Sequence, residues 1–136
     1  MRLAQVAIWC TDLEGLRAFY ERHFAARAGD KYVNEAKRFE SYFLTLPNGG
    51  QIELMRRQGI PARVDDVERI GIVHLGIEVA SNAVVDELTS EICGALGQAP
   101  ADGPRWTGDG YYESVVRDPE GNRLLIVSVE RRARVR

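Results

Sequence analysis

The sequence contains two similar halves, and this repeat constrains the fold more than any other feature. Residues QVAIWCTDLEGLRAFY align with HLGIEVASNAVVDELT at an offset of 69, which pairs Gln5 with His74. Residues PNGGQIELM align with PEGNRLLIV at an offset of 72, which pairs Glu53 with Leu125. Two matches in the same order at nearly the same offset indicate two modules of about seventy residues each.

The first module is predicted to contain a strand, a helix and a hairpin. Residues 3–9 are rich in apolar side chains, and Thr11 with Glu14 forms a capping box that predicts the start of a helix. Apolar residues then recur at three- and four-residue steps until Gly29, where the helical pattern ends. Two β-rich runs flank the turn residues 47–50 and read as a hairpin, and a short strand is expected at 31–34.

The second module repeats this order. A strand is predicted at 70–79, a helix from Ser81 to about Leu96, and a hairpin that turns at residues 118–121. We therefore expect one domain, with module one at 1–58, a polar connector at 59–69, module two at 70–130 and a basic tail at 131–136. The fold class is predicted as α+β, with two tandem βαβββ modules.

Composition excludes several classes of protein. The chain has 136 residues, 45% of them hydrophobic, with a formal net charge of −2, so no basic stripe points to nucleic acid. No apolar run is long enough for a membrane span or a signal peptide, which predicts a cytoplasmic protein. Cys10 and Cys93 have no CxxC spacing and are expected to be free thiols.

Strand alternation assigns the side chains of each predicted strand to one of its two faces. In QIELM, Ile52 and Leu54 are expected to pack against the first helix, which leaves Glu53 on the opposite, concave face. Gln5 shares a face with Trp9, and His74 shares a face with Glu78. Polar groups are therefore expected to lie on the concave faces.

The chain resembles the vicinal oxygen chelate superfamily, which includes glyoxalase I, bleomycin-resistance proteins, fosfomycin-resistance enzymes and extradiol dioxygenases. The segments that carry the resemblance are LAQVAIWCTDLEGLRAFYERHF, QIELM, GIVHLGIEV and GDGYYESVVRDPEGNRLLIV. The resemblance implies paired modules that form an open, barrel-like mixed sheet around a cavity, with helices on the convex faces. It also implies a homodimer and a small-molecule substrate or ligand.

In metal-dependent members, the first and last strands of each module supply the metal ligands. The matching positions here are Gln5, Glu53, His74 and Leu125. The resemblance therefore implies a site for Zn, Ni, Co, Mn or Fe made by the first three, with Leu125 in place of the fourth ligand. Because leucine can neither bind a cation nor move a proton, glyoxalase I activity itself is not expected. The alternative is that Glu53 and His74 pair with each other or with water.

Other residues are candidates for substrate binding or catalysis. Glu78 could supply the missing carboxylate as ligand or base, or lie in solvent at a strand end. Arg105 and Trp106 lie in a glycine-rich segment that could arch over the cavity or form a plain surface loop. The remaining candidates are Arg123 at the cavity mouth and three side chains of the second module's hairpin, Tyr112, Ser114 and Leu125. Tyr112 and Ser114 are expected to share a face and, if the hairpin pairs across the turn at 118–121, to lie near Leu125.

Two functions are consistent with these features. The first is a metal-dependent lyase, isomerase or dioxygenase, in which the cation chelates vicinal oxygens of a small substrate. The second is a metal-free protein that binds and sequesters a drug-like or aromatic molecule, because Leu125, Val127, Tyr112 and Trp106 make part of the wall apolar.

Overall fold

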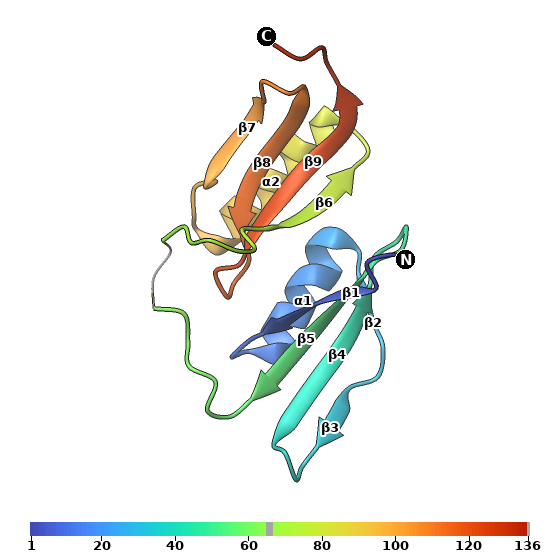
Figure 1. The fold of residues 1–136 in the computed structure, drawn as a ribbon, viewed down its shortest axis with the longest axis vertical. Coiled ribbons are helices and arrows are strands. Elements are labelled where there is room, and N and C mark those ends of the chain that lie inside the picture. The colour runs from blue at the N-terminus through green and yellow to red at the C-terminus, as the bar shows by residue number, and fades with distance from the viewer. Residues whose placement is uncertain (65–66, 136) are drawn as a thin grey trace. The chain divides into compact units, whose positions relative to one another are not determined.

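The computed structural model describes residues 1–64 and 67–135, and the chain divides into two compact units, 1–66 and 67–136. The division lies within the segment 59–69 expected as the connector. We call these parts unit 1 and unit 2. Each contains a mixed sheet with one helix packed on it, as the ribbon of each unit shows (Figure 1). The α+β class with two modules is confirmed.

Unit 1 has a five-stranded sheet of order β1-β5-β4-β2, with β3 paired to β4. Strand β1 (Gln5–Trp9) runs parallel to β5 (Gln51–Arg57), and β5 is antiparallel to β4 (Phe39–Thr45). The short strands are β2 (Arg27–Ala28) and β3 (Tyr32–Asn34). The buried residues that join sheet and helix are Leu13, Leu16, Phe19, Tyr20, Leu44, Ile52 and Leu54.

Helix α1 (Leu13–Phe24) differs from the sequence prediction at both ends. The side chain of Asp12, rather than Thr11, caps it, and its Oδ1 accepts a hydrogen bond from Gly15 N at 2.9 Å. The helix ends at Phe24 because Ala25 adopts a left-handed conformation with φ of 52°, five residues before the predicted end. Ile52 and Leu54 are buried, as alternation predicts for residues that back onto this helix.

Unit 2 has a four-stranded sheet of order β6-β9-β8-β7. Strand β6 (Leu75–Val79) is parallel to β9 (Arg123–Arg131), which is antiparallel to β8 (Tyr111–Arg117), and β7 (Asp102–Trp106) forms the far edge. Strand β6 begins five residues later than predicted. Helix α2 (Asn82–Leu96) begins after Ser81, whose Oγ accepts a hydrogen bond from Val84 N at 3.3 Å, as predicted.

The two hairpin turns show the repeat at atomic detail. Leu46 N donates to Gly50 O at 3.1 Å in unit 1, and Asp118 N donates to Asn122 O at 2.9 Å in unit 2. Unit 2 adds side-chain bonds, because the buried Asp118 carboxylate accepts from the backbone N of Glu120 and Asn122, each at 2.9 Å. The same backbone turn therefore forms with and without a carboxylate.

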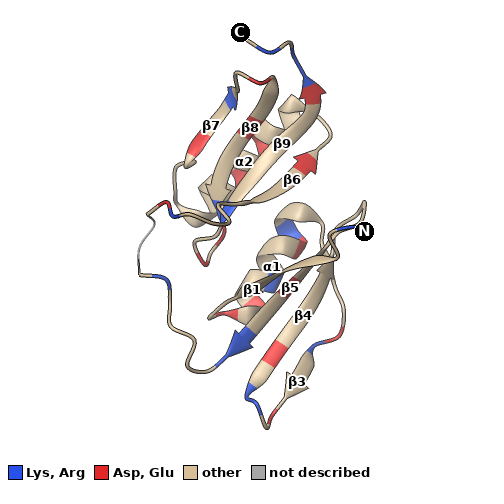
Figure 2. Ribbon diagram, viewed as in Figure 1, with Lys and Arg blue, Asp and Glu red and all other residues tan. Residues whose placement is uncertain are grey.

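Charged residues of both signs are scattered over the strands of each unit and over α1, whereas α2 carries acidic residues alone (Figure 2). This distribution fits the formal net charge of −2. No helix in the described part of the chain is long and apolar enough to cross a membrane.

Candidate functional site

In each unit, the sheet face opposite the helix is the face on which we expected polar groups, and we call it the open face. In unit 1 the Gln5 side chain on β1 reaches the carboxylate of Glu53 on β5, and its Nε2 donates to Glu53 Oε1 at 3.1 Å. The strand register places Glu53 directly beside Ala7. Gln5 and Glu53 therefore lie together, as the alternation of their strands predicts.

Aromatic side chains occupy much of the rest of this open face. Trp9 contacts Phe39 edge to face with ring centroids 6.1 Å apart, and Tyr32 contacts the same Phe39 ring at 6.0 Å. Phe43 lies directly opposite Glu53 in the register of β4 and β5. Trp9, Phe43 and Tyr32 are 41%, 42% and 53% exposed. We call Trp9, Tyr32, Phe39 and Phe43 the aromatic face.

Two further groups border the aromatic face. The Arg57 guanidinium lies over the Trp9 ring, 5.2 Å from its centroid, which is a cation–π geometry. Ser41 lies on the same side of β4 as Phe39 and Phe43, paired with Met55, and is almost completely buried. The aromatic face therefore has a carboxylate, that of Glu53, near one side and a cation, that of Arg57, near the other.

Sequence reasoning placed Trp9 on the face of Gln5 but assigned no role to the aromatic residues of unit 1. The signal was present, because alternation in FESYFLT puts Phe39, Ser41 and Phe43 on one side of a strand. The partner strand had to be known before these rings could be placed beside Glu53, and the pairing of β4 with β5 supplies it.

In unit 2, Leu125 takes the position that Glu53 has in unit 1. The register places Leu125 beside Gly76 on β6, as Glu53 lies beside Ala7 on β1. A Cβ added to Gly76 would lie 3.7 Å from Leu125 Cδ2, so the leucine leans over the glycine. His74 is exposed and directly precedes β6 rather than lying within it.

The donors that the structure brings together in one unit do not complete a metal site. Gln5 and Glu53 supply an amide oxygen and a carboxylate, whereas catalytic zinc sites use three protein ligands. No group of three or more His, Cys, Asp or Glu side chains suited to a metal ion occurs among residues 1–64 and 67–135. Unit 1 alone therefore does not fit a catalytic metal.

The remaining sequence candidates on the open face of unit 2 are engaged in ion pairs. Glu78 Oε2 lies 3.3 Å from Arg131 Nη2, so the carboxylate suggested as a replacement base already has a cation beside it. Arg123 Nη1 lies 4.0 Å from Glu68 Oε1 at the start of β9.

Arg105 and Trp106 lie in strand β7, so the expectation of an arching or surface loop is wrong for them. The Arg105 guanidinium forms a two-pronged pair with Asp102, with Nε to Oδ1 at 3.0 Å and Nη2 to Oδ2 at 2.7 Å. This hydrogen-bonded pair holds the pKa of the Asp102 carboxyl below its usual value. The Trp106 ring lies 5.2 Å from the Tyr112 ring and 4.8 Å from the Arg132 guanidinium.

Tyr112 and Ser114 share a face, but it is the helix side of the sheet and not the face of Leu125. Tyr112 Oη donates to Asp86 Oδ1 on α2 at 2.7 Å, and this bond raises the pKa of the Tyr112 hydroxyl. The buried Ser114 hydroxyl lies 2.5 Å from the Thr89 hydroxyl on α2. The expectation that they lie beside Leu125 fails, because Val115 is the residue that pairs with Leu125.

Glu113 is the residue of β8 that faces the open side near Leu125, and sequence reasoning missed it. Its register partners are Val127 on β9 and Arg105 on β7. Burial is the largest influence on this carboxyl and raises its pKa, while Arg105 opposes the increase. Alternation in YYESVV puts Glu113 on the opposite face of the strand from Tyr112. Which face of the sheet this is becomes known only once Tyr112 is placed on the helix side.

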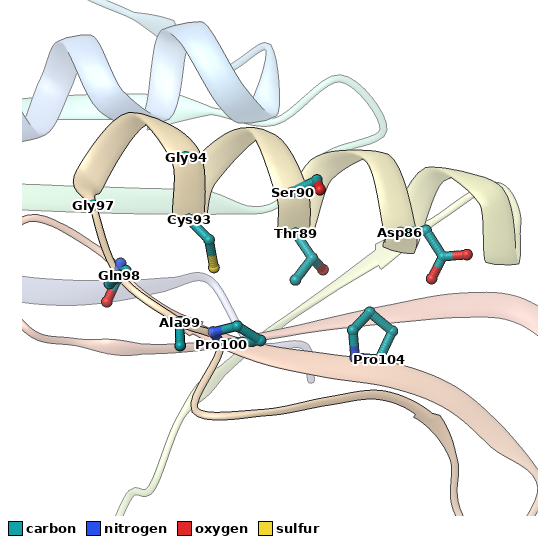
Figure 3. Close-up of a pocket in the computed structure, with 10 residues that line it drawn as sticks. All are labelled: Asp86, Thr89, Ser90, Cys93, Gly94, Gly97, Gln98, Ala99, Pro100 and Pro104. Carbon is teal, nitrogen blue, oxygen red and sulfur yellow. The ribbon is translucent and has the colours of Figure 1, made fainter.

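A cavity of about 750 Å³ lies on the helix side of unit 2, beside α2 (Figure 3). Its lining includes Asp86 and Thr89 of α2, Pro100 between α2 and β7, and Pro104 within β7. The Cys93 thiol points into it. The Asp86 carboxylate and the Thr89 hydroxyl already form hydrogen bonds with Tyr112 and Ser114 of β8. This cavity is separate from the open face of the same sheet.

Comparison with known proteins defines the family. The family model of the glyoxalase/bleomycin resistance protein/dioxygenase superfamily matches residues 2–126. The chain therefore belongs to this superfamily, which confirms the resemblance seen in the sequence. No curated protein matches the chain.

Several solved structures have the same fold at low sequence identity. A glyoxylase/bleomycin resistance protein/dioxygenase domain from Frankia sp. EAN1pec is 19% identical, with a TM-score of 0.77 over 94% of this chain and 91% of that one. A genomically encoded fosfomycin resistance protein from Listeria monocytogenes is 20% identical, with a TM-score of 0.68 over 92% and 91%. The trypanothione-dependent glyoxalase I from Leishmania major is 17% identical, with a TM-score of 0.72 over 94% and 86%.

Proposed function

We propose that this protein binds a small planar aromatic molecule on the open face of unit 1. The observation that carries the proposal is the aromatic face of Trp9, Tyr32, Phe39 and Phe43, which lies beside the Glu53 carboxylate. Exposed apolar patches bordered by polar groups are typical of binding surfaces. Aromatic side chains give such a surface a preference for flat ligands, through stacked and edge-to-face contacts.

The polar border favours a ligand that has a hydrogen-bond donor. Gln5 occupies only Glu53 Oε1, and within the described residues no donor reaches Glu53 Oε2. A ligand N–H or O–H that bonds to this oxygen would orient the ring across Phe43 and Trp9. Arg57, at the far end of the face, favours an electron-rich substituent on the opposite side of the ring.

Fluorescence can test this proposal because each unit contains one tryptophan. In the Trp106→Phe variant only Trp9 remains, and 4-nitroaniline, a planar amine that absorbs tryptophan emission, is expected to quench it to saturation. The reverse variant, Trp9→Phe, retains only Trp106, which is not part of the aromatic face, and is expected to show weaker quenching at each concentration. Saturable quenching of Trp106 alone, or linear quenching in both variants, would contradict the proposal.

The Gln5–Glu53 pair favours a second candidate function, a metal-dependent lyase, isomerase or dioxygenase. The pair brings an amide side chain and a carboxylate together, and His74 is the third donor implied by the family pattern. The measurement is metal content by plasma mass spectrometry after incubation with divalent metals and desalting. This candidate predicts one metal per chain that is lost in both Glu53→Gln and His74→Ala, whereas metal-free protein in all three samples removes it.

A further inference from the structure

We propose a second binding site on the open face of unit 2, for a small organic cation whose ammonium group pairs with Glu113 and whose apolar part packs on Leu125, Val127 and Val115. The site lies within one unit. Its residues differ from those of the aromatic face in unit 1, so either site can fail without the other.

The apolar part of the site follows from the strand register. Glu113 pairs with Val127, and Val115 pairs with Leu125 in the next row of the same face. Leu125 and Val127 are half-buried and Val115 is 9% exposed. A carboxylate among these side chains has lost part of its hydration, so an opposite charge from a ligand would stabilise it more than at an ordinary surface position.

The carboxyl of Glu113 lacks a partner of its own. Within residues 67–135, no side chain or backbone group donates a hydrogen bond to it and no cation lies within ion-pair distance. Arg105, its neighbour on β7, is held by both oxygens of Asp102. Glu78, on the same open face, is by contrast already paired with Arg131.

The surrounding charges favour a positively charged ligand. The side chains that act on Glu113 from neighbouring elements are Arg105, Asp109, His74 and Asp102. Arg105 and His74 stabilise the carboxylate, whereas Asp109 and Asp102 repel it. Arg105 is shared with Asp102, so three carboxylates lie around one guanidinium and one imidazole, and a cation balances the excess negative charge.

The probe for this site is benzylamine, with benzyl alcohol as a neutral analogue of the same shape. Titrations followed by amide chemical shifts are expected to give a Kd for benzylamine at least tenfold lower than for benzyl alcohol. The largest shifts are expected at Glu113, Leu125 and Val127. In Glu113→Gln the preference for the amine should disappear, while the affinity for benzyl alcohol stays unchanged.

Glu78→Gln is the matched control, because it removes a carboxylate from the same face that already has a cation. The preference for benzylamine should persist in this variant. The proposal is overturned if Glu113→Gln keeps the preference, if benzylamine does not bind, or if its shifts fall in unit 1 or beside Asp86 in the cavity along α2. Amide spectra of each variant without ligand verify that the fold is intact.

Discussion

Replacing Trp9 with alanine is expected to weaken the binding of 4-nitroaniline at least tenfold. Trp9 provides the largest exposed ring of the aromatic face and contacts Phe39 and Arg57. Its truncation removes a stacking surface, and aromatic pairs contribute about 0.5–1.5 kcal/mol beyond the area they bury. A tenfold loss corresponds to about 1.4 kcal/mol. Calorimetry is the suitable measurement because the variant lacks the fluorescent reporter.

Two variants serve as controls for this result. Trp9→Phe retains a ring and should recover most of the affinity. Trp106→Ala removes the tryptophan of unit 2, whose ring lies against Tyr112 and Arg132, and should leave the affinity unchanged. Equal affinities of Trp9→Ala and the unmodified protein would show that the ligand does not contact the aromatic face.

Replacing Asp118 with alanine is expected to lower the free energy of unfolding of unit 2 by about 3 kcal/mol. This is less than the sum of three hydrogen bonds to a charged group, at about 1.5–3 kcal/mol each, because water can reach the half-buried donors Glu120 and Asn122. The carboxylate is buried and accepts three hydrogen bonds at 2.9 Å, from Glu120 N, Asn122 N and Asn122 Nδ2. Removing it leaves these donors without their acceptor. Urea unfolding followed through the amide signals of unit 2 measures the loss.

Asp118→Asn is the informative comparison, because its amide oxygen can still accept the two backbone bonds. It should lose clearly less stability than Asp118→Ala. Leu46 stands at the equivalent position of unit 1 and its turn keeps the same backbone bond to Gly50. If Asp118→Ala proves as stable as the unmodified protein, the carboxylate is not needed for the turn of unit 2 either.

The sequence predicted the fold through features that act locally. The two hairpin turns, the Ser81 cap and the buried positions Ile52 and Leu54 each follow from a few neighbouring residues. The end of α1 did not, since the left-handed conformation at Ala25 has no glycine or asparagine to mark it. Strand β7 was missed because Gly103 and Pro104 are typical of loops, although the edge position of β7 tolerates them.

The candidate site was only partly predictable, because a face can be assigned only when the partner strand is known. Glu53 and Gln5 were placed correctly, since both strands alternate clearly. The sequence prediction put Tyr112 and Ser114 on the face of Leu125, whereas both lie on the helix side of the sheet. Glu113, which lies between them in the strand, was therefore overlooked. A shift of one residue in a strand exchanges every side chain between the two faces, and hydrophobicity does not separate the faces of YYESVV.

We propose that the aromatic face of unit 1 binds a planar aromatic ligand. The most direct test is a map of amide chemical shifts during titration with 4-nitroaniline. Saturable shifts are expected, concentrated at β1, β4 and β5 around Trp9, Phe43 and Glu53. Shifts confined to unit 2, or no saturable shifts at all, would contradict it.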